Sequence, residues 1–97
     1  MIRHIVFFKF DPNKPEAAQT SAKLLRELPK KIDVIRYLQV GFDVTHSSRS
    51  YDMALICDFD HLADLAAYDV HPEHQKVREY IHSVRIGTAA CDFEYDA

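Results

Sequence analysis

The segment from Ile2 to Phe10 constrains the fold most, because it is apolar on both of its faces. Isoleucine, valine and phenylalanine dominate it, and it ends at the turn-forming residues 11–13, so it is predicted to be a β-strand. Alternate residues of a strand point to opposite sides. One side carries Ile2, His4, Val6, Phe8 and Phe10, and the other carries Arg3, Ile5, Phe7 and Lys9. The centre of this strand therefore needs cover on both sides.

The rest of the chain shows the periodicities of further strands and helices. Apolar residues recur at helical spacing between Pro15 and Pro29, and a longer helical stripe begins at Pro72, after a short helical turn near Leu62. Strands are predicted at 34–44, 51–59 and 88–95, with Gly87 marking the passage to the last of them. This order predicts an α+β fold, in which right-handed crossovers place both helices on one face of a four-stranded antiparallel sheet. The 97 residues are expected to form a single domain, a ferredoxin-like βαββαβ subunit.

The second face of such a sheet has no helix to cover it. Its apolar residues would form a patch larger than a monomer usually exposes, and the same face of a second copy is the natural cover. We therefore expect a homodimer that is joined through the exposed sheet faces and forms an α+β barrel.

Composition excludes several other partners. The net charge is −3 and the lysines and arginines are scattered, which argues against nucleic acid. The apolar run from Ile5 to Phe8 is too short for a signal-peptide core or a membrane span, so we expect no membrane partner and a cytoplasmic location. Cys57 and Cys91 show no metal or redox spacing and are interpreted as reduced core residues.

The most unusual local pattern places Tyr68, His71 and His74 at three-residue intervals around a helix start. If Pro72 begins the helix, His74 falls on the same stripe as Val77 and Ile81 and faces inward. Burial and the helix dipole both disfavour an imidazolium there, so His74 is expected to be neutral and able to accept a proton. Tyr68 would donate a phenolic hydrogen bond to a carbonyl. His71 is expected at the helix cap.

His4 is the third candidate, because a polar side chain is out of place between Ile2 and Val6. If its side of the strand turns toward the helices, His4 and His74 line one cavity; if it turns toward the partner subunit, His4 is a barrel residue. The sequence leaves both open. A structural interpretation also stays open, in which His74 binds a backbone carbonyl and Tyr68 is only a wall of the core.

The predicted site thus has two groups of residues. His74, Tyr68 and His4 are the candidate catalytic residues, and His71, Phe8, Val77 and Ile81 are the candidate ligand-binding residues. No metal site is predicted, because the spacing of His71 and His74 is a weak signal and no fourth ligand accompanies them and His4. No cofactor is predicted either.

Several of these residues together resemble a known family. The matching features are His4 in an apolar first strand, Tyr51 and Asp52 opening the third strand, Phe59 and Asp60 closing it, and then Tyr68, Val70, His71, Pro72, Glu73, His74 and Gln75. In these features the chain resembles the stress-responsive α/β-barrel (Dabb) domain family. The resemblance implies a ferredoxin-like subunit that dimerises through its sheets. A polyketide-cyclase branch of the family implies acid and base roles for Tyr68 and His74, with His4 matching an N-terminal strand histidine.

Two main hypotheses follow for the function. In the first, the dimer is a stress-associated protein that binds a small aromatic or carbonyl ligand in a pocket between sheet and helices. In the second, it is a cofactor-independent cyclase, lyase or isomerase that uses Tyr68 and His74 as acid and base. A haem- or metal-binding role of the barrel superfamily is the third alternative.

Overall fold

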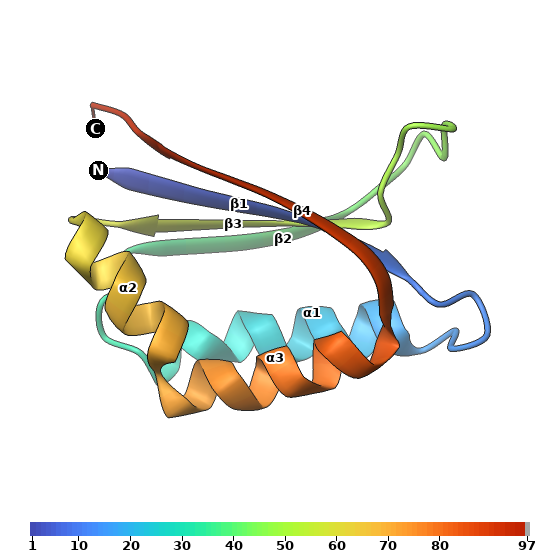
Figure 1. Ribbon diagram of the computed structural model, residues 1–97, viewed down its shortest axis with the longest axis horizontal. Coiled ribbons are helices and arrows are strands. Elements are labelled where there is room, and N and C mark those ends of the chain that lie inside the picture. Colours follow the sequence, from blue (N-terminus) through green and yellow to red (C-terminus); the bar gives the residue numbers. More distant parts are fainter. Residues whose placement is uncertain (97) are drawn as a thin grey trace.

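The computed structural model describes residues 1–96 and confirms the predicted fold class (Figure 1). The elements are β1 (Ile2–Phe10), α1 (Ala17–Glu27), the short 3-10 helix η1 (Leu28–Lys30), β2 (Tyr37–Phe42), β3 (Met53–Phe59), α2 (Leu62–Val70), α3 (Pro72–Val84) and β4 (Arg85–Glu94). The strands form one antiparallel sheet in the order β2-β3-β1-β4. The long apolar strand β1 is therefore central, as its two apolar faces require.

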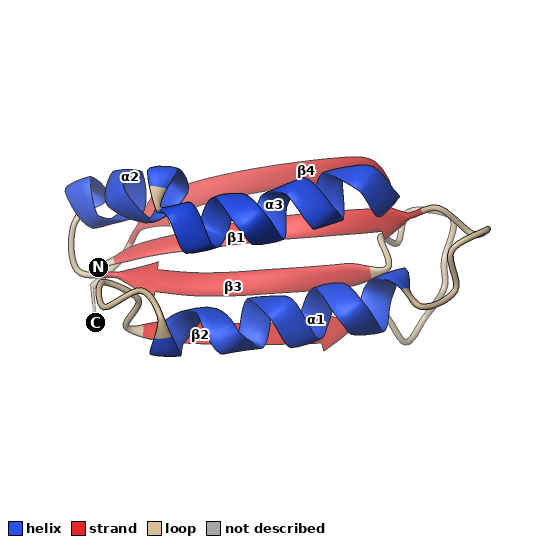
Figure 2. Ribbon diagram, turned by 90° about the horizontal axis from the view of Figure 1, so that it is seen from below, coloured by secondary structure: helices blue, strands red, loops and turns tan. Residues whose placement is uncertain are grey.

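All three α-helices lie on one side of the sheet, and α1 and α3 run along it side by side (Figures 1 and 2). The side of β1 that carries His4 and Phe8 faces these helices. The β3 residues that pair with His4 and Phe8 are Cys57 and Met53, and both are buried on this side. The core between sheet and helices is closed by Leu25 of α1 and by the apolar stripe of α3.

Several predicted boundaries differ from the structure. Strand β3 begins at Met53 rather than at Tyr51. Strand β2 is shorter than predicted, because Ile35 packs its side chain into the core from the preceding loop. The predicted turn near Leu62 is a complete helix, α2. Strand β4 begins at Arg85 rather than at Thr88, since pairing with β1 continues to Phe10, and Gly87 lies inside the strand opposite Lys9.

The opposite side of the sheet is uncovered, and we call it the bare face. It consists of Arg3, Ile5, Phe7, Tyr37, Gln39, Gly41, Ala54, Ile56, Asp58, Ala89, Cys91 and Phe93. Tyr37, Phe7 and Phe93 keep 46%, 42% and 42% of their surface exposed. Phe7 also stacks on Tyr51 beside the sheet. An apolar face with three exposed aromatic rings is unusual for a surface that meets only water.

The two cysteines lie on opposite faces of the sheet, and both are free. Cys57 is fully buried on the helix side, where burial raises the pKa of its thiol to about 12. Cys91 pairs with Ile5 on the bare face and is exposed, so the prediction that it is a core residue is wrong for the single chain. The reason is that β4 is an edge strand, and no helix covers this side of it.

Asp58 anchors a polar cluster at one end of the bare face. Its carboxylate accepts two hydrogen bonds from the guanidinium of Arg3, at 2.9 and 2.8 Å, and one from the hydroxyl of Tyr95 at 2.8 Å. The hydrogen bonds from Arg3 are the main reason why the pKa of Asp58 lies below its ordinary value of 3.8. The Asp58 side chain is almost completely buried under these partners.

Replacing Asp58 with asparagine is expected to lower the free energy of unfolding by about 1.5–3 kcal/mol near neutral pH, the range for hydrogen bonds to charged groups. Because the folded pKa lies below the unfolded one, the contribution of Asp58 is complete above the unfolded pKa and is lost as the pH falls through the folded pKa. Urea unfolding at fixed protein concentration, near neutral pH and in acid, measures both effects. The Asp58→Asn variant should be the less sensitive to acid.

Asp60→Asn is the matched control for this prediction. Asp60 pairs with Arg36 at 2.8 Å, but both side chains are far more exposed than Asp58. An exposed ion pair of this kind contributes about 0–1 kcal/mol. An equal decrease in the free energy of unfolding of the two variants would contradict the special role of Asp58.

Within residues 1–96, no helix is long and apolar enough to cross a membrane.

Candidate functional site

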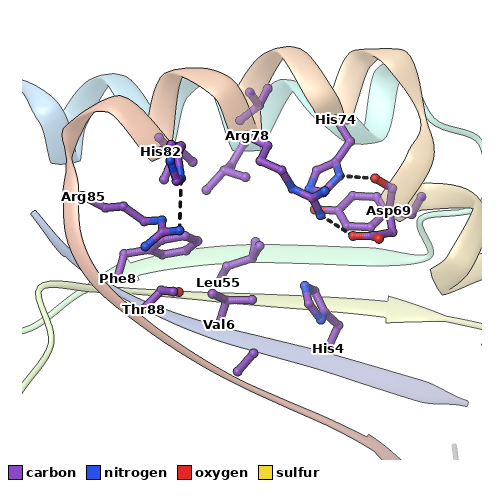
Figure 3. Close-up of a pocket in the computed structure, with 15 residues that line it drawn as sticks. His4, Val6, Phe8, Leu55, Asp69, His74, Arg78, His82, Arg85 and Thr88 are labelled. Carbon is purple, nitrogen blue, oxygen red and sulfur yellow. Dashed lines mark hydrogen bonds and ion pairs between the residues drawn. The ribbon is translucent and has the colours of Figure 1, made fainter.

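A cavity of about 280 Å³ lies between the sheet and the helices, below α3 (Figure 3). Apolar side chains form most of its wall, and polar side chains reach it from β1, α2, α3 and β4. The lining residues are His4, Val6, Phe8, Leu25, Leu55, Tyr68, Asp69, His74, Val77, Arg78, Ile81, His82, Arg85, Thr88 and Ala90. Six of the seven predicted site residues are among them, and His71 is the exception.

His74 lies in the first turn of α3 and is buried. Its Nδ1 lies 3.1 Å from the carbonyl oxygen of Asp69, which can only accept, so Nδ1 carries the proton and Nε2 has a free lone pair. Burial is the main reason why the pKa of His74 lies below its ordinary value of 6.5. His74 is therefore a neutral hydrogen-bond acceptor near pH 7, and it also makes the backbone contact that the structural interpretation predicts.

Tyr68 lies near the end of α2, with its ring against His74. The two ring centroids are 4.1 Å apart, and the ring of Phe59 packs on Tyr68 at 5.1 Å. Its hydroxyl is buried and has no hydrogen-bond partner among the described residues. Burial raises the pKa of Tyr68 far above its ordinary value, so the hydroxyl keeps its proton. A buried donor without a partner costs about 1–3 kcal/mol, which a bound acceptor would recover.

His4 faces the helices, so the first of the two alternatives for it is correct. Its ring centroid lies 6.0 Å from that of Tyr68, and its Nδ1 lies 2.5 Å from a carboxylate oxygen of Asp92. Asp92 is opposite His4 in the β1–β4 pairing. Because the carboxylate accepts the Nδ1 proton, the ring is held in one orientation with Nε2 away from Asp92.

His71 caps α3 and stays outside the cavity wall. Its Nδ1 accepts a hydrogen bond from the backbone N–H of Glu73 at 3.1 Å, as the cap interpretation predicts. The predicted ligand-binding role is not supported by this position, because the ring is engaged with its own helix end. In the described part of the chain, no three His, Cys, Asp or Glu side chains are grouped so that they could hold a metal ion.

Several cavity residues were missed in the sequence. Arg78 and His82 lie one and two turns after His74 on α3, a spacing that could have indicated them. His82 is exposed as well as lining the cavity, so it lies at the open end of the cavity wall. Arg78 pairs with Asp69, and Arg85 contacts His82 (Figure 3). The pairing of β4 with β1 brings three more residues to the site, namely Arg85, Thr88 and Asp92. Nothing in the sequence near these residues indicates that pairing.

The site combines hydrogen-bonding groups of opposite kinds inside an apolar wall. His74 offers an acceptor, Tyr68 a donor, and His4 a ring nitrogen whose orientation Asp92 fixes. Such a set can hydrogen-bond a carbonyl or phenol oxygen of a small ligand while apolar side chains contact the rest of it.

Several solved structures have the same fold, and their alignments cover nearly the whole of this chain. A dimeric protein of unknown function and ferredoxin-like fold from Bacteroides fragilis NCTC 9343 is 29% identical, with a TM-score of 0.87 over 97% of this chain and 95% of that one. A dimeric ferredoxin-like protein of unknown function from Thermobifida fusca YX is 26% identical, with a TM-score of 0.86 over 97% and 90%. A hydroxynitrile lyase from Passiflora edulis has a TM-score of 0.87 over 98% and 93%, and at 13% identity it shows the shared fold alone.

A comparison with curated proteins gives no match. The sequence model of the stress-responsive A/B barrel domain, in contrast, matches residues 2–95. This match confirms the resemblance carried by His4, the strand ends and the segment from Tyr68 to Gln75. The chain belongs to the stress-responsive A/B barrel domain (Dabb) family.

Proposed function

We propose that this protein binds a small aromatic or carbonyl compound in the cavity between its sheet and helices. The single observation that carries the proposal is the buried hydroxyl of Tyr68, which lacks a partner and belongs to a residue of the cavity wall. A ligand oxygen that accepts this proton would remove the cost of the unmet donor. The ring of His74 beside it supplies the complementary acceptor.

The apolar wall favours an aromatic or alkyl body for the ligand. Phe8, Leu55, Val77 and Ile81 are buried in the core and also line the cavity. Contacts with such side chains provide affinity with little direction, and the few polar groups provide orientation. His4 supports the site through its hydrogen bond with Asp92, since the fixed ring presents Nε2 in one direction.

The Tyr68→Phe variant tests the proposal with 4-hydroxyacetophenone as the probe. It is expected to bind the probe about 2- to 12-fold more weakly, which corresponds to one neutral hydrogen bond of about 0.5–1.5 kcal/mol. The free energy of unfolding without ligand should stay the same or rise, because the variant removes a buried donor that has no partner. An NMR titration and urea unfolding measure the two quantities.

Tyr37→Phe is the matched control, since Tyr37 is exposed on the bare face and donates to Gln39. It should leave probe affinity unchanged. The proposal would be contradicted if Tyr68→Phe lost stability while keeping its affinity for the probe, because the hydroxyl would then have a structural role.

A second candidate function is a cofactor-independent lyase, isomerase or cyclase. The observation in its favour is that the neutral His74 and the protonated Tyr68 lie side by side. Nε2 of His74 would take a proton from the carbon next to a substrate carbonyl. The electron pair of that C–H bond would form a C=C bond, and the π electron pair of the C=O bond would move to the oxygen. Tyr68 would stabilise the oxygen as it gains negative charge.

The protein acts as a homodimer joined through its bare faces. This proposal is supported by the exposed Phe7, Tyr37 and Phe93, which a second copy would cover. The single chain exposes 6178 Å², whereas a monomer of this mass typically exposes about 5700 Å². Two of the similar solved structures, at 29% and 26% identity, are themselves dimeric ferredoxin-like proteins. The cavity lies on the other side of the sheet, so both subunits would keep an open site.

A further inference from the structure

The end of the cavity farther from His74 carries a guanidinium group that no carboxylate neutralises. Arg85 lies there, where α3 passes into β4, well apart from His74 and His4 (Figure 3). Among the described residues, Arg3, Arg36 and Arg78 form ion pairs with aspartates, but Arg85 forms none. Asp69, the acidic residue of the cavity wall, is already paired with Arg78.

Two further donors accompany Arg85. Its guanidinium lies 3.2 Å from Nδ1 of His82, and since a guanidinium can only donate, this nitrogen accepts. With Nδ1 accepting, the N–H group that His82 can donate is at Nε2. The hydroxyl of Thr88 lies in the same part of the cavity wall (Figure 3).

This combination matches a carboxylate. A guanidinium binds the two oxygens of a carboxylate with parallel N–H groups, and a neighbouring histidine N–H and a hydroxyl can complete the set. The adjacent wall is apolar, with Val6, Phe8 and Ile81. His82 and Thr88 are exposed and Arg85 is half-buried, so the group lies at the open end of the cavity.

The two polar ends of the cavity are separated by a fixed length of helix. His74 and His82 are eight residues apart on α3, which corresponds to about 12 Å along the helix axis. A ligand that reaches both ends must therefore be elongated, with an apolar middle against the wall.

We propose that Arg85, together with His82 and Thr88, binds the carboxylate of an aryl or alkyl acid whose carbonyl or phenol oxygen lies at His74 and Tyr68. The inference rests on the proposed function and narrows its ligand to one chemical class, an elongated acid with an oxygen group at the far end. It makes Arg85 a residue that determines specificity and leaves the chemistry at His74 unchanged.

The experiment compares 3-(4-acetylphenyl)propanoate with its methyl ester by NMR titration near neutral pH. The parent protein is expected to bind the acid at least about tenfold more tightly than the ester, the effect of one hydrogen-bonded charge pair. Arg85→Gln should abolish this preference and bind the ester within about twofold of the parent. Arg49→Gln removes the same charge from an exposed loop residue outside this cavity and should keep the preference.

Each other outcome has a definite meaning. If acid and ester bind the parent equally, or if Arg85→Gln keeps the preference, the carboxylate site is overturned while carbonyl binding stands. If neither compound binds, the proposed function fails and this inference with it. If the phosphonate analogue binds more tightly than the acid and depends on Arg85, the site belongs to phosphoryl groups and the carboxylate assignment is overturned. A urea unfolding curve for Arg85→Gln that matches the parent assigns any lost affinity to the site itself.

Discussion

Replacing Ile5 with lysine is expected to convert the proposed dimer into a monomer. Ile5 lies at the centre of the bare face, between Ile56 of β3 and Cys91 of β4. In a symmetric pairing of two such faces, each copy would bring one lysine into an apolar interface. An unpaired buried charge costs several kcal/mol, which is a large part of the stability of a small interface. The charge would instead remain in water, and the subunits would separate.

Sedimentation equilibrium at micromolar concentration measures this effect directly. The parent should have about twice the mass of the 11.2 kDa chain, and Ile5→Lys should have the mass of one chain. The midpoint of urea unfolding should rise with protein concentration for the parent only, because only its folded state is dimeric. Gln19→Lys, which adds the same charge to an exposed position of α1, should remain dimeric.

A parent mass near 11.2 kDa would contradict the dimer without any variant. The exposed rings of Phe7 and Phe93 would then need another explanation. A dimeric Ile5→Lys variant would instead show that the subunits meet through some surface other than the bare face.

The fold could be predicted because its main constraint is local in the sequence. The two apolar sides of the segment from Ile2 to Phe10 require a central strand with cover on both sides, and the order of the other elements leaves one arrangement of the helices. The boundaries of β4 were harder, because Arg85 joins the strand through its pairing with Phe10 and has no strand signal of its own. The exposure of Cys91 follows from the position of β4 at the edge of the sheet.

The site could be predicted in part, and most directly on α3, although Tyr68 of α2 and His4 and Phe8 of β1 were also named and line the cavity. His74 was found from its spacing to Val77 and Ile81, and its burial and lowered pKa follow from that position. The orientation of His4 could not be derived, because either side of a strand with two apolar faces can turn toward the helices. Asp92 and Arg85 were missed for a related reason. They reach the site through strand pairing between residues far apart in the chain.

For the second candidate function, a cofactor-independent enzyme, replacing His74 with glutamine is expected to lower turnover of a carbonyl substrate by about 10²- to 10⁴-fold, the usual contribution of a general base. Glutamine keeps a polar side chain of similar length but cannot take a proton at neutral pH. Binding of 4-hydroxyacetophenone should change much less, because apolar contacts and Tyr68 would remain. His46→Gln, at an exposed loop position, is the matched control and should change neither quantity.

The pH dependence separates a base from a merely polar group. Only the neutral imidazole can accept a proton, and the pKa of His74 lies below 6.5 in the folded protein. The parent's turnover should therefore stay level as the pH falls to about 6.5, and should drop as the pH passes through the folded pKa. The free energy of unfolding should also fall as the pH falls below about 6.5, because the unfolded chain takes up the proton first. His74→Gln should reduce this loss of stability. If the parent turns over no member of a carbonyl panel while His74→Gln still binds the probe, the enzyme candidate is wrong and the cavity is a binding site only.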